Sequence, residues 1–200
     1  MKKKLFFTFI VMGFFQHCWS ASSSPSEWLT QIEHYMNASK TWEATFEQLN
    51  PNGSLYQGKF FLQRPGKMRL IYTYPKTQTM IADGSWLIIQ DKENDELTTL
   101  ALKDTPAEFF LRESIRFSEG VTVTDFSAED GRFKVTLVRA QEPETGSLTL
   151  TFTQAPLQLI QWITIDANQL KTVVNLKDIQ RDVALDPKLF VFNHPDFLPR

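Results

Sequence analysis

The sequence predicts a fold of the α+β class that is mainly β: an incomplete antiparallel β-barrel of about ten or eleven strands, with a lid of two or three helices over an apolar cavity. Two observations predict it. Short runs rich in Thr, Val, Ile and Phe alternate between apolar and polar residues, with turn signals between them. Two helix-start patterns precede apolar stretches that need a surface to cover. Alternation alone would fit a β-sandwich nearly as well.

Strand-like runs follow one another along most of the chain. The first lies at 42–48, and the next two form a hairpin over 58–72 around a Pro65-Gly66 turn. The remaining runs are 85–91, 96–100, 121–126, 132–139, 148–153, 159–166 and 171–179. Because short turns separate the runs, we expect an antiparallel meander that curls as strands are added.

The hairpin carries an arginine on its apolar side. At period two, one face of its two strands takes Gly58, Phe60, Leu62, Arg64, Met68, Leu70, Tyr72 and Tyr74. A guanidinium stays charged at ordinary pH, so a buried Arg64 needs hydrogen-bond acceptors. On spacing alone, the commoner outcome is an arginine at a strand end that extends to water. Arg69 alternates to the opposite face, where we expect it to be solvated.

Two helices begin with the same pattern. Ser24-Pro25-Ser26-Glu27 and Thr105-Pro106-Ala107-Glu108 each place a hydroxyl residue at the N-cap, proline at the first helical position and glutamate at N3. Apolar residues then follow at helical spacing, with Trp28, Ile32, Tyr35 and Met36 in the first helix and Phe109 and Phe110 in the second. We predict that these side chains form the inner side of the lid.

The strands keep their bulky apolar residues for one side. The candidate cavity wall consists of Trp42, Phe46, Phe60, Leu62, Met68, Leu70, Tyr72, Trp86 and Ile88. For any single one of these residues, a filled core is the commoner explanation. However, large flat and flexible side chains on an open curved sheet leave space that an apolar ligand can enter.

The residues offer little for catalysis. His34 and His194 are the only histidines beyond the first twenty residues, and neither a Gly-x-Ser-x-Gly nor a His-Glu-x-x-His motif is present. Carboxylate pairs of the glycosidase kind remain an alternative, namely Glu43 with Glu47 or Asp125 with Asp130. We therefore expect a binding protein with no catalytic residue, no metal site and no cofactor.

The N-terminus predicts export. Lys2 to Lys4 precede an apolar run, Leu5 to Phe15, that is too short to cross a bilayer and fits a secretory signal. We predict a signal peptide over 1–20 and a single domain over 21–200. Without the signal, 18 basic residues stand against 23 acidic ones, a net charge of −5. This balance argues against nucleic acid as a partner.

Several segments occur together in one order. They are Trp42-x-Ala44-x-Phe46-x-Gln48, Gly58-x-Phe60-x-Leu62-x-Arg64-Pro65-x-x-x-Arg69, Ala82-Asp83-Gly84-x-x-Leu87 and Leu189-Phe190-Val191-Phe192-x-x-Pro195. In this order they resemble the LolA family of periplasmic carriers of outer-membrane lipoproteins. The last segment looks like the final strand of that family. The resemblance implies the same half-open barrel with a helical lid.

The resemblance also implies a function. The cargo would be the acyl chains of lipoproteins, received from an inner-membrane ABC-type lipoprotein-releasing complex and delivered to an outer-membrane lipoprotein receptor or to the outer membrane. The carrier would act in the periplasm as a monomer, and Arg64 would latch the lid by binding backbone carbonyls of the lid helices. Three alternatives stay open: a periplasmic regulator that senses a lipid or peptide with the same half-barrel, the related outer-membrane lipoprotein receptor, and a structural domain of the cell envelope.

Overall fold

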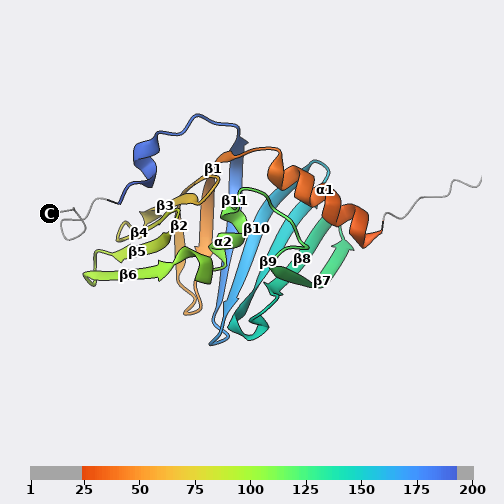
Figure 1. Cartoon of the computed structure of the whole chain (residues 1–200). Helices are drawn as coiled ribbons and strands as arrows, with labels where there is room; N and C mark the ends of the chain where they lie inside the picture. Colours follow the sequence, from red (N-terminus) through yellow and green to blue (C-terminus); the bar gives the residue numbers. More distant parts are fainter. Residues whose placement is uncertain (1–23, 193–200) are drawn as a thin grey trace, which may run out of the picture.

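The computed structural model describes residues 24–192, and eleven strands within this range form one antiparallel sheet (Figure 1). The strands are β1 (Thr41–Leu49), β2 (Leu55–Gln63), β3 (Lys67–Tyr74), β4 (Gln78–Asp83), β5 (Trp86–Asp91), β6 (Glu96–Ala101), β7 (Val121–Glu129), β8 (Arg132–Arg139), β9 (Gly146–Gln154), β10 (Leu157–Asp166) and β11 (Lys171–Arg181). The same described range contains two α-helices, α1 (Pro25–Asn37) and α2 (Ala107–Leu111), and three short 3₁₀ turns, η1 (Leu102–Asp104), η2 (Pro143–Thr145) and η3 (Pro187–Phe190). The predicted signal peptide, 1–20, lies outside the described residues.

The sheet has the order β6-β5-β4-β3-β2-β1-β11-β10-β9-β8-β7. It consists of two meanders, β1 to β6 and β7 to β11, which are joined side by side because β1 pairs with β11. β6 and β7 are the two edges, at opposite ends of the sheet in Figure 1, and no pairing between them closes a barrel within residues 24–192. The prediction of a mainly β, incomplete antiparallel barrel is confirmed.

The sequence interpretation missed one strand and misplaced another. It assigned no strand to 78–83, which forms β4 between β3 and β5. It also placed a last strand at 189–192, whereas η3 begins just before it, because Asp186 caps this turn by accepting a hydrogen bond from the Lys188 backbone N–H at 2.9 Å. Pro187 at the first position favours a helical start and supplies no N–H for a strand ladder.

Helix α1 crosses one half of the sheet (Figure 1). The capping box predicted at its start is present, with Ser24 and Glu27 bonding each other's backbone N–H groups. The inner face of α1 buries Ile32, Tyr35 and Met36. Ring contacts tie the helix to the sheet, with Trp28 packing 4.3 Å from Phe133 between ring centroids. This half of the interior is therefore filled.

Helix α2 belongs to the connection between the two edge strands. The segment 102–120 leaves β6, passes over the helix-covered face of the sheet and enters β7. The capping box predicted at Thr105 and Glu108 does not form. The Thr105 hydroxyl instead donates to the carbonyl of Leu102 in the preceding 3₁₀ turn at 2.9 Å, and Glu108 pairs with Arg112 one turn later. The apolar residues Phe109 and Phe110 still face the core, as expected.

The opposite face of the sheet carries its own apolar contact. Buried Phe61, Ile81 and Ile88 lie on the side away from the helices, and η3 packs against β3 and β4 with Phe190 buried. Arg69 was expected to be solvated, but it is partly buried and donates from Nη1 to the Leu189 carbonyl at 2.8 Å. Burial lowers the pKa of Arg69. The C-terminal segment thus covers a face that alternation alone assigned to solvent.

Candidate functional site

A cavity of about 380 Å³ lies between α2 and the sheet. Its volume falls in the range of roughly 300 to 1,000 Å³ that is usual for small-molecule sites. The apolar part of its wall comes from both meanders and from α2, and comprises Phe60, Met68, Leu70, Met80, Leu87, Ile89, Leu100, Pro106, Ala107, Phe110, Trp162, Ile165 and Val174. Polar groups stand among them at Gln48, Thr105, Thr164, Asp166 and Thr172. The site suits a long apolar ligand with a polar end.

The residues predicted to line a cavity divide into three groups. Phe60, Met68 and Leu70 lie in its wall, and Phe110 of the predicted lid covers it. The second group, Trp42, Phe46, Leu62 and Tyr72, is buried in the packed core beside the cavity. In that core Trp42 meets Tyr35 of α1 edge to face, with centroids 5.7 Å apart, and Phe46 meets Tyr72 in the same way at 5.2 Å.

Trp86 and Ile88 form the third group, and their predicted orientation is wrong. Ile88 is buried on the opposite face of the sheet, and Trp86 is 49% exposed. Their neighbours Leu87 and Ile89 line the cavity instead. The β4–β5 turn sets this orientation, because the Asp83 carboxylate accepts hydrogen bonds from the backbone N–H groups of Ser85 and Trp86. Tyr74, expected on the inner side of β3, is also exposed, because the β2–β3 register shifts between Gln57 and Gly58.

Sequence reasoning missed the aromatic residue that connects the sheet to the lid. The Trp162 ring on β10 lies 5.4 Å from that of Phe60 on β2 and 5.3 Å from that of Phe110 on α2, between centroids. Aromatic pairs at this distance attract one another beyond simple burial. The three rings therefore bridge one side of the cavity. Trp162 sits in a predicted strand, but only the pairing of β10 with β11 brings it near the hairpin.

A polar pair connects the cavity wall, at Gln48, to Tyr72 in the core beside it. The Tyr72 hydroxyl donates to the Gln48 side-chain oxygen at 3.0 Å, and the Gln48 amide donates to Asn50. Burial raises the pKa of Tyr72 well above its ordinary value. The phenol is therefore neutral at physiological pH.

Arg64 is buried, with only 4% of its surface exposed. Its Nη2 donates to the backbone carbonyls of Met36, in the last turn of α1, and Ser39, just beyond the helix. Its Nε and Nη1 are buried without hydrogen-bond partners. Burial, and to a smaller extent the charge of Arg181, lower the pKa of Arg64 to about 10, so the side chain remains protonated at neutral pH.

The hydrogen bonds of the Arg64 side chain go to α1, not to both helices as expected. The link to α2 comes from the turn that follows, where the Gly66 backbone N–H donates to the carbonyl of Leu111 at 2.8 Å. Gly66 has φ +78°, and a Cβ at this position would lie 2.7 Å from Gly84 Cα. A larger residue would therefore disturb the turn that holds α2.

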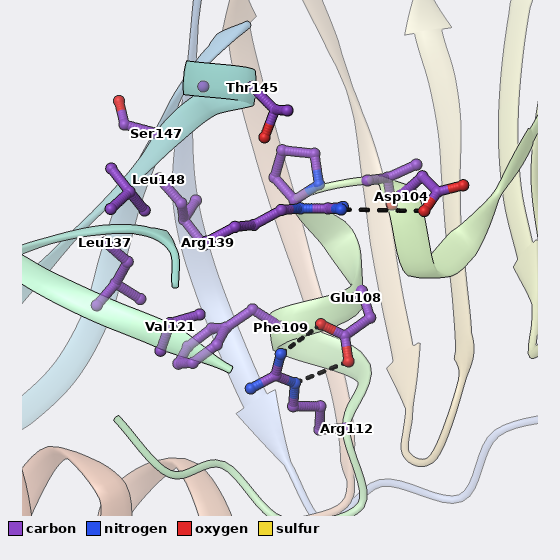
Figure 2. A pocket seen from close by; sticks show the side chains of 14 residues that line it. Asp104, Glu108, Phe109, Arg112, Val121, Leu137, Arg139, Thr145, Ser147 and Leu148 are labelled. Carbon is purple, nitrogen blue, oxygen red and sulfur yellow. Dashed lines mark hydrogen bonds and ion pairs between the residues drawn. The ribbon is translucent and has the colours of Figure 1, made fainter. Parts of the chain in front are cut away.

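A smaller hollow of about 70 Å³ lies on the other side of α2, next to β7, β8 and β9 (Figure 2). Figure 2 shows Arg112 directed at Glu108 and Arg139 directed at Asp104, with separations of 2.7 and 3.9 Å. Arg139 also donates to the Lys103 carbonyl at 2.8 Å. This hollow is too small for a ligand of drug size, and its charged groups are paired. Its side chains hold α2 and η1 in place.

The carboxylates weighed as catalytic pairs do not face each other across a cleft. Glu43 pairs with Lys59 at 3.7 Å and Glu47 pairs with Lys177 at 2.9 Å, each across neighbouring strands. Asp125 and Asp130 are exposed. Residues 24–192 contain no group of three or more His, Cys, Asp or Glu side chains placed to bind a metal ion. In the same range, no helix is both long and apolar enough to span a membrane.

Comparisons with known proteins agree with this fold. Residues 37–193 match the family model described as "Outer membrane lipoprotein carrier protein LolA". A protein of Methylococcus capsulatus named outer-membrane lipoprotein carrier protein is 27% identical over 188 residues, covering 89% of each chain. One of the same name from Alkalilimnicola ehrlichii is 28% identical over 148 residues, covering 70% of this chain and 64% of its own.

Among solved structures, an uncharacterized conserved protein from Thermus thermophilus superimposes with a TM-score of 0.50 at 8% identity, covering 86% of this chain and 96% of its own. At that identity the likeness concerns the fold alone. The family match, in contrast, spans well over half of the sequence and includes β1 to β11, α2 and Arg64. The chain therefore belongs to the LolA family of outer membrane lipoprotein carrier proteins.

Proposed function

We propose that this protein is a periplasmic carrier that binds the acyl chains of lipoproteins in the cavity beneath α2 and delivers them to the outer membrane. The observation that carries the proposal is the cavity itself, whose wall is mostly apolar and which lies beside a well-packed core. Apolar space of this size attracts a ligand because water inside it is poorly hydrogen-bonded. The polar residues among its lining suit the polar linkage that joins acyl chains to a protein.

The free-energy cost of exposing acyl chains to water explains why a carrier must bury them. Burying one CH₂ group is worth roughly 0.8 kcal/mol, so a chain of about sixteen carbons costs on the order of 12 kcal/mol to expose to water. A carrier that gained all of this free energy would never release its cargo. Part of the gain must therefore be spent on opening the protein, so that the net affinity stays moderate.

The lid supplies this opening cost. Phe110 packs on Trp162 within the cavity wall, and the end of α2 is tied to the β2–β3 turn through Gly66 and Leu111. An entering acyl chain separates α2 from the sheet and breaks these contacts. The Arg64 bonds to α1 belong to the same closed arrangement, and we propose that they act as the latch.

The family gives the proposal its setting. Cargo is taken up in the periplasm from an inner-membrane ABC-type lipoprotein-releasing complex and passed to an outer-membrane lipoprotein receptor or to the outer membrane. Export through the signal peptide at 1–20, and action as a monomer, belong to this proposal. No cofactor and no chemical step are needed.

The test is binding of a synthetic triacylated lipopeptide to the protein from Ala21 onwards, followed by native mass spectrometry and by displacement of a fluorescent fatty acid. Met80→Trp adds bulk to the cavity wall, and we expect it to weaken binding at least tenfold. Thr79→Trp is the matched control, since neighbouring residues of a strand point to opposite faces. Failure of the wild-type protein to bind the lipopeptide, or equal binding by both variants, would refute the proposal.

A further inference from the structure

The C-terminal end of α1 is held by two arginines. Arg64 follows β2 and donates to the carbonyls of Met36 and Ser39, while Arg181 at the end of β11 donates from Nη2 to the carbonyl of Tyr35 at 2.9 Å. β2 and β11 flank β1 on its two sides. Both guanidinium groups thus reach the same helix end from strands on either side of β1, although the two residues are far apart in sequence.

Aromatic rings fix the orientation of this pair. The Arg181 guanidinium lies 4.4 Å from the centroid of the Tyr35 ring and 5.5 Å from that of Trp42. The Arg64 guanidinium lies 5.9 Å from Trp42 on β1, the strand between them. Cations at these distances are attracted by the ring faces. Trp42 and Tyr35 therefore place both arginines at the helix end.

Within residues 24–192, the two positive charges meet the helix end and aromatic rings but no carboxylate. Among the ion pairs of residues 24–192, none involves Arg64 or Arg181. The last carbonyls of a helix carry partial negative charge and favour cations. Arg64 Nε and Nη1 and Arg181 Nε are also buried without partners. When the lid is closed, these donors therefore lack hydrogen-bond partners. Water would supply partners when the lid opens.

The same helix is joined to the segment that follows α2. The Asn37 side chain donates to the Ile115 carbonyl at 2.9 Å and accepts from the Ile115 N–H at 2.8 Å. Glu33, one turn earlier, accepts a hydrogen bond from the Phe117 N–H at 2.6 Å. These bonds tie the end of α1 to residues 115–117, which lie between α2 and β7.

We propose that Arg181 is a second positioning residue of the lid, which clamps the end of α1 together with Arg64, and that Asn37 couples this clamp to the segment after α2. The proposal rests on the proposed carrier function, because it concerns the regulation of the same cavity. Release of the two arginines frees α1 and 115–117 together, and α2 then loosens over the cavity.

The experiment is hydrogen exchange of the protein from Ala21 onwards, compared for wild type, Arg181→Gln, Arg181→Lys and Arg132→Gln. Arg132 is an exposed arginine on β8 and serves as the matched control. For Arg181→Gln we expect the amides of the last turn of α1 and of 115–117 to exchange about tenfold faster, with β1 and β11 unchanged. Arg181→Lys keeps a cationic donor and should restore most of the protection. If the glutamine variant does not fold, Asn37→Ala replaces it; this variant removes both bonds to Ile115 and should speed exchange at 115–117, and wild-type exchange there would overturn the coupling.

Transfer of a fluorescent fatty acid to acceptor vesicles gives a second readout, and we expect it to be about tenfold slower in Arg181→Gln than in wild type, because closing the lid no longer restores the bond to Tyr35 that helps to expel the ligand. Wild-type exchange rates in α1 of Arg181→Gln would overturn the clamp. Faster exchange confined to β1 and β11 would also overturn it, because it would show that Arg181 stabilises only the sheet. Exchange needs no ligand. A wild-type protein that binds no acyl ligand would therefore refute the proposed function, while the exchange result would still decide the role of Arg181.

Discussion

Replacing Arg64 by leucine is expected to leave the fold intact and to slow the release of ligand. The substitution removes hydrogen bonds to the carbonyls of Met36 and Ser39, each worth about 1.5–3 kcal/mol because the donor is charged. It also removes two buried donors without partners, Nε and Nη1, which cost about 1–3 kcal/mol each. Burial of the leucine side chain adds about 1.5–3 kcal/mol to the free energy of unfolding. These contributions nearly cancel, so we expect the free energy of unfolding to change by less than about 2 kcal/mol.

The lid responds differently from the fold. Closing the wild-type lid restores the Arg64 hydrogen bonds to α1 and so helps to expel the ligand, whereas in Arg64→Leu this gain is lost and the new apolar side chain stays against the core or the bound acyl chain. This difference of about 1.5–3 kcal/mol corresponds to roughly 10- to 100-fold slower transfer of ligand. The assay is stopped-flow transfer of a fluorescent fatty acid to acceptor vesicles, with urea unfolding measured in parallel and Arg132→Leu as the control. Transfer at the wild-type rate, or a loss of stability above about 4 kcal/mol, would refute this reasoning.

Two further predictions concern Tyr72, in the core beside the cavity, and the outer face of the sheet. Burial raises the pKa of Tyr72 above the ordinary value of 10.0. The folded protein therefore favours the neutral phenol, and this contribution to stability is complete below pH 10 and is lost as the pH rises above 10. Urea unfolding at pH 9 and pH 11 should therefore show a smaller loss of stability in Tyr72→Phe than in wild type, and equal losses would contradict the assignment. Phe190→Ala should cost about 3 kcal/mol by removing the buried ring of η3, yet leave fatty-acid binding unchanged, because this ring lies on the face away from the helices. A weakened affinity in that variant would show that the outer face contributes to the site.

Alternation along the chain predicted the shared face of the β2–β3 hairpin, because each strand side chain follows the previous one at a fixed period of two. Phe60, Met68 and Leu70 were found in the cavity wall for that reason. The same rule failed at Trp86, where the orientation depends on hydrogen bonds to Asp83 in the preceding turn rather than on the pattern of β5 itself. A period of two states which residues share a face, but not which face the helices cover.

Contacts between residues that are distant in sequence could not be predicted from the sequence. Arg69 meets the carbonyl of Leu189, and Arg181 meets that of Tyr35, through backbone acceptors that carry no residue-type signal. Trp162 approaches Phe60 and Phe110 only after β1 has paired with β11. By contrast, the capping box of α1 was readable, because all of its groups lie within four residues.

The most direct test of the acyl-binding cavity is quenching by a fatty acid that carries bromine on its chain, measured in variants that keep one tryptophan and have phenylalanine at the others. Trp162 lies in the cavity wall, whereas Trp86 lies outside it and is half exposed. The account predicts strong quenching of Trp162 and little quenching of Trp86 when the ligand is bound. Equal quenching of both, or quenching of Trp86 alone, would contradict it.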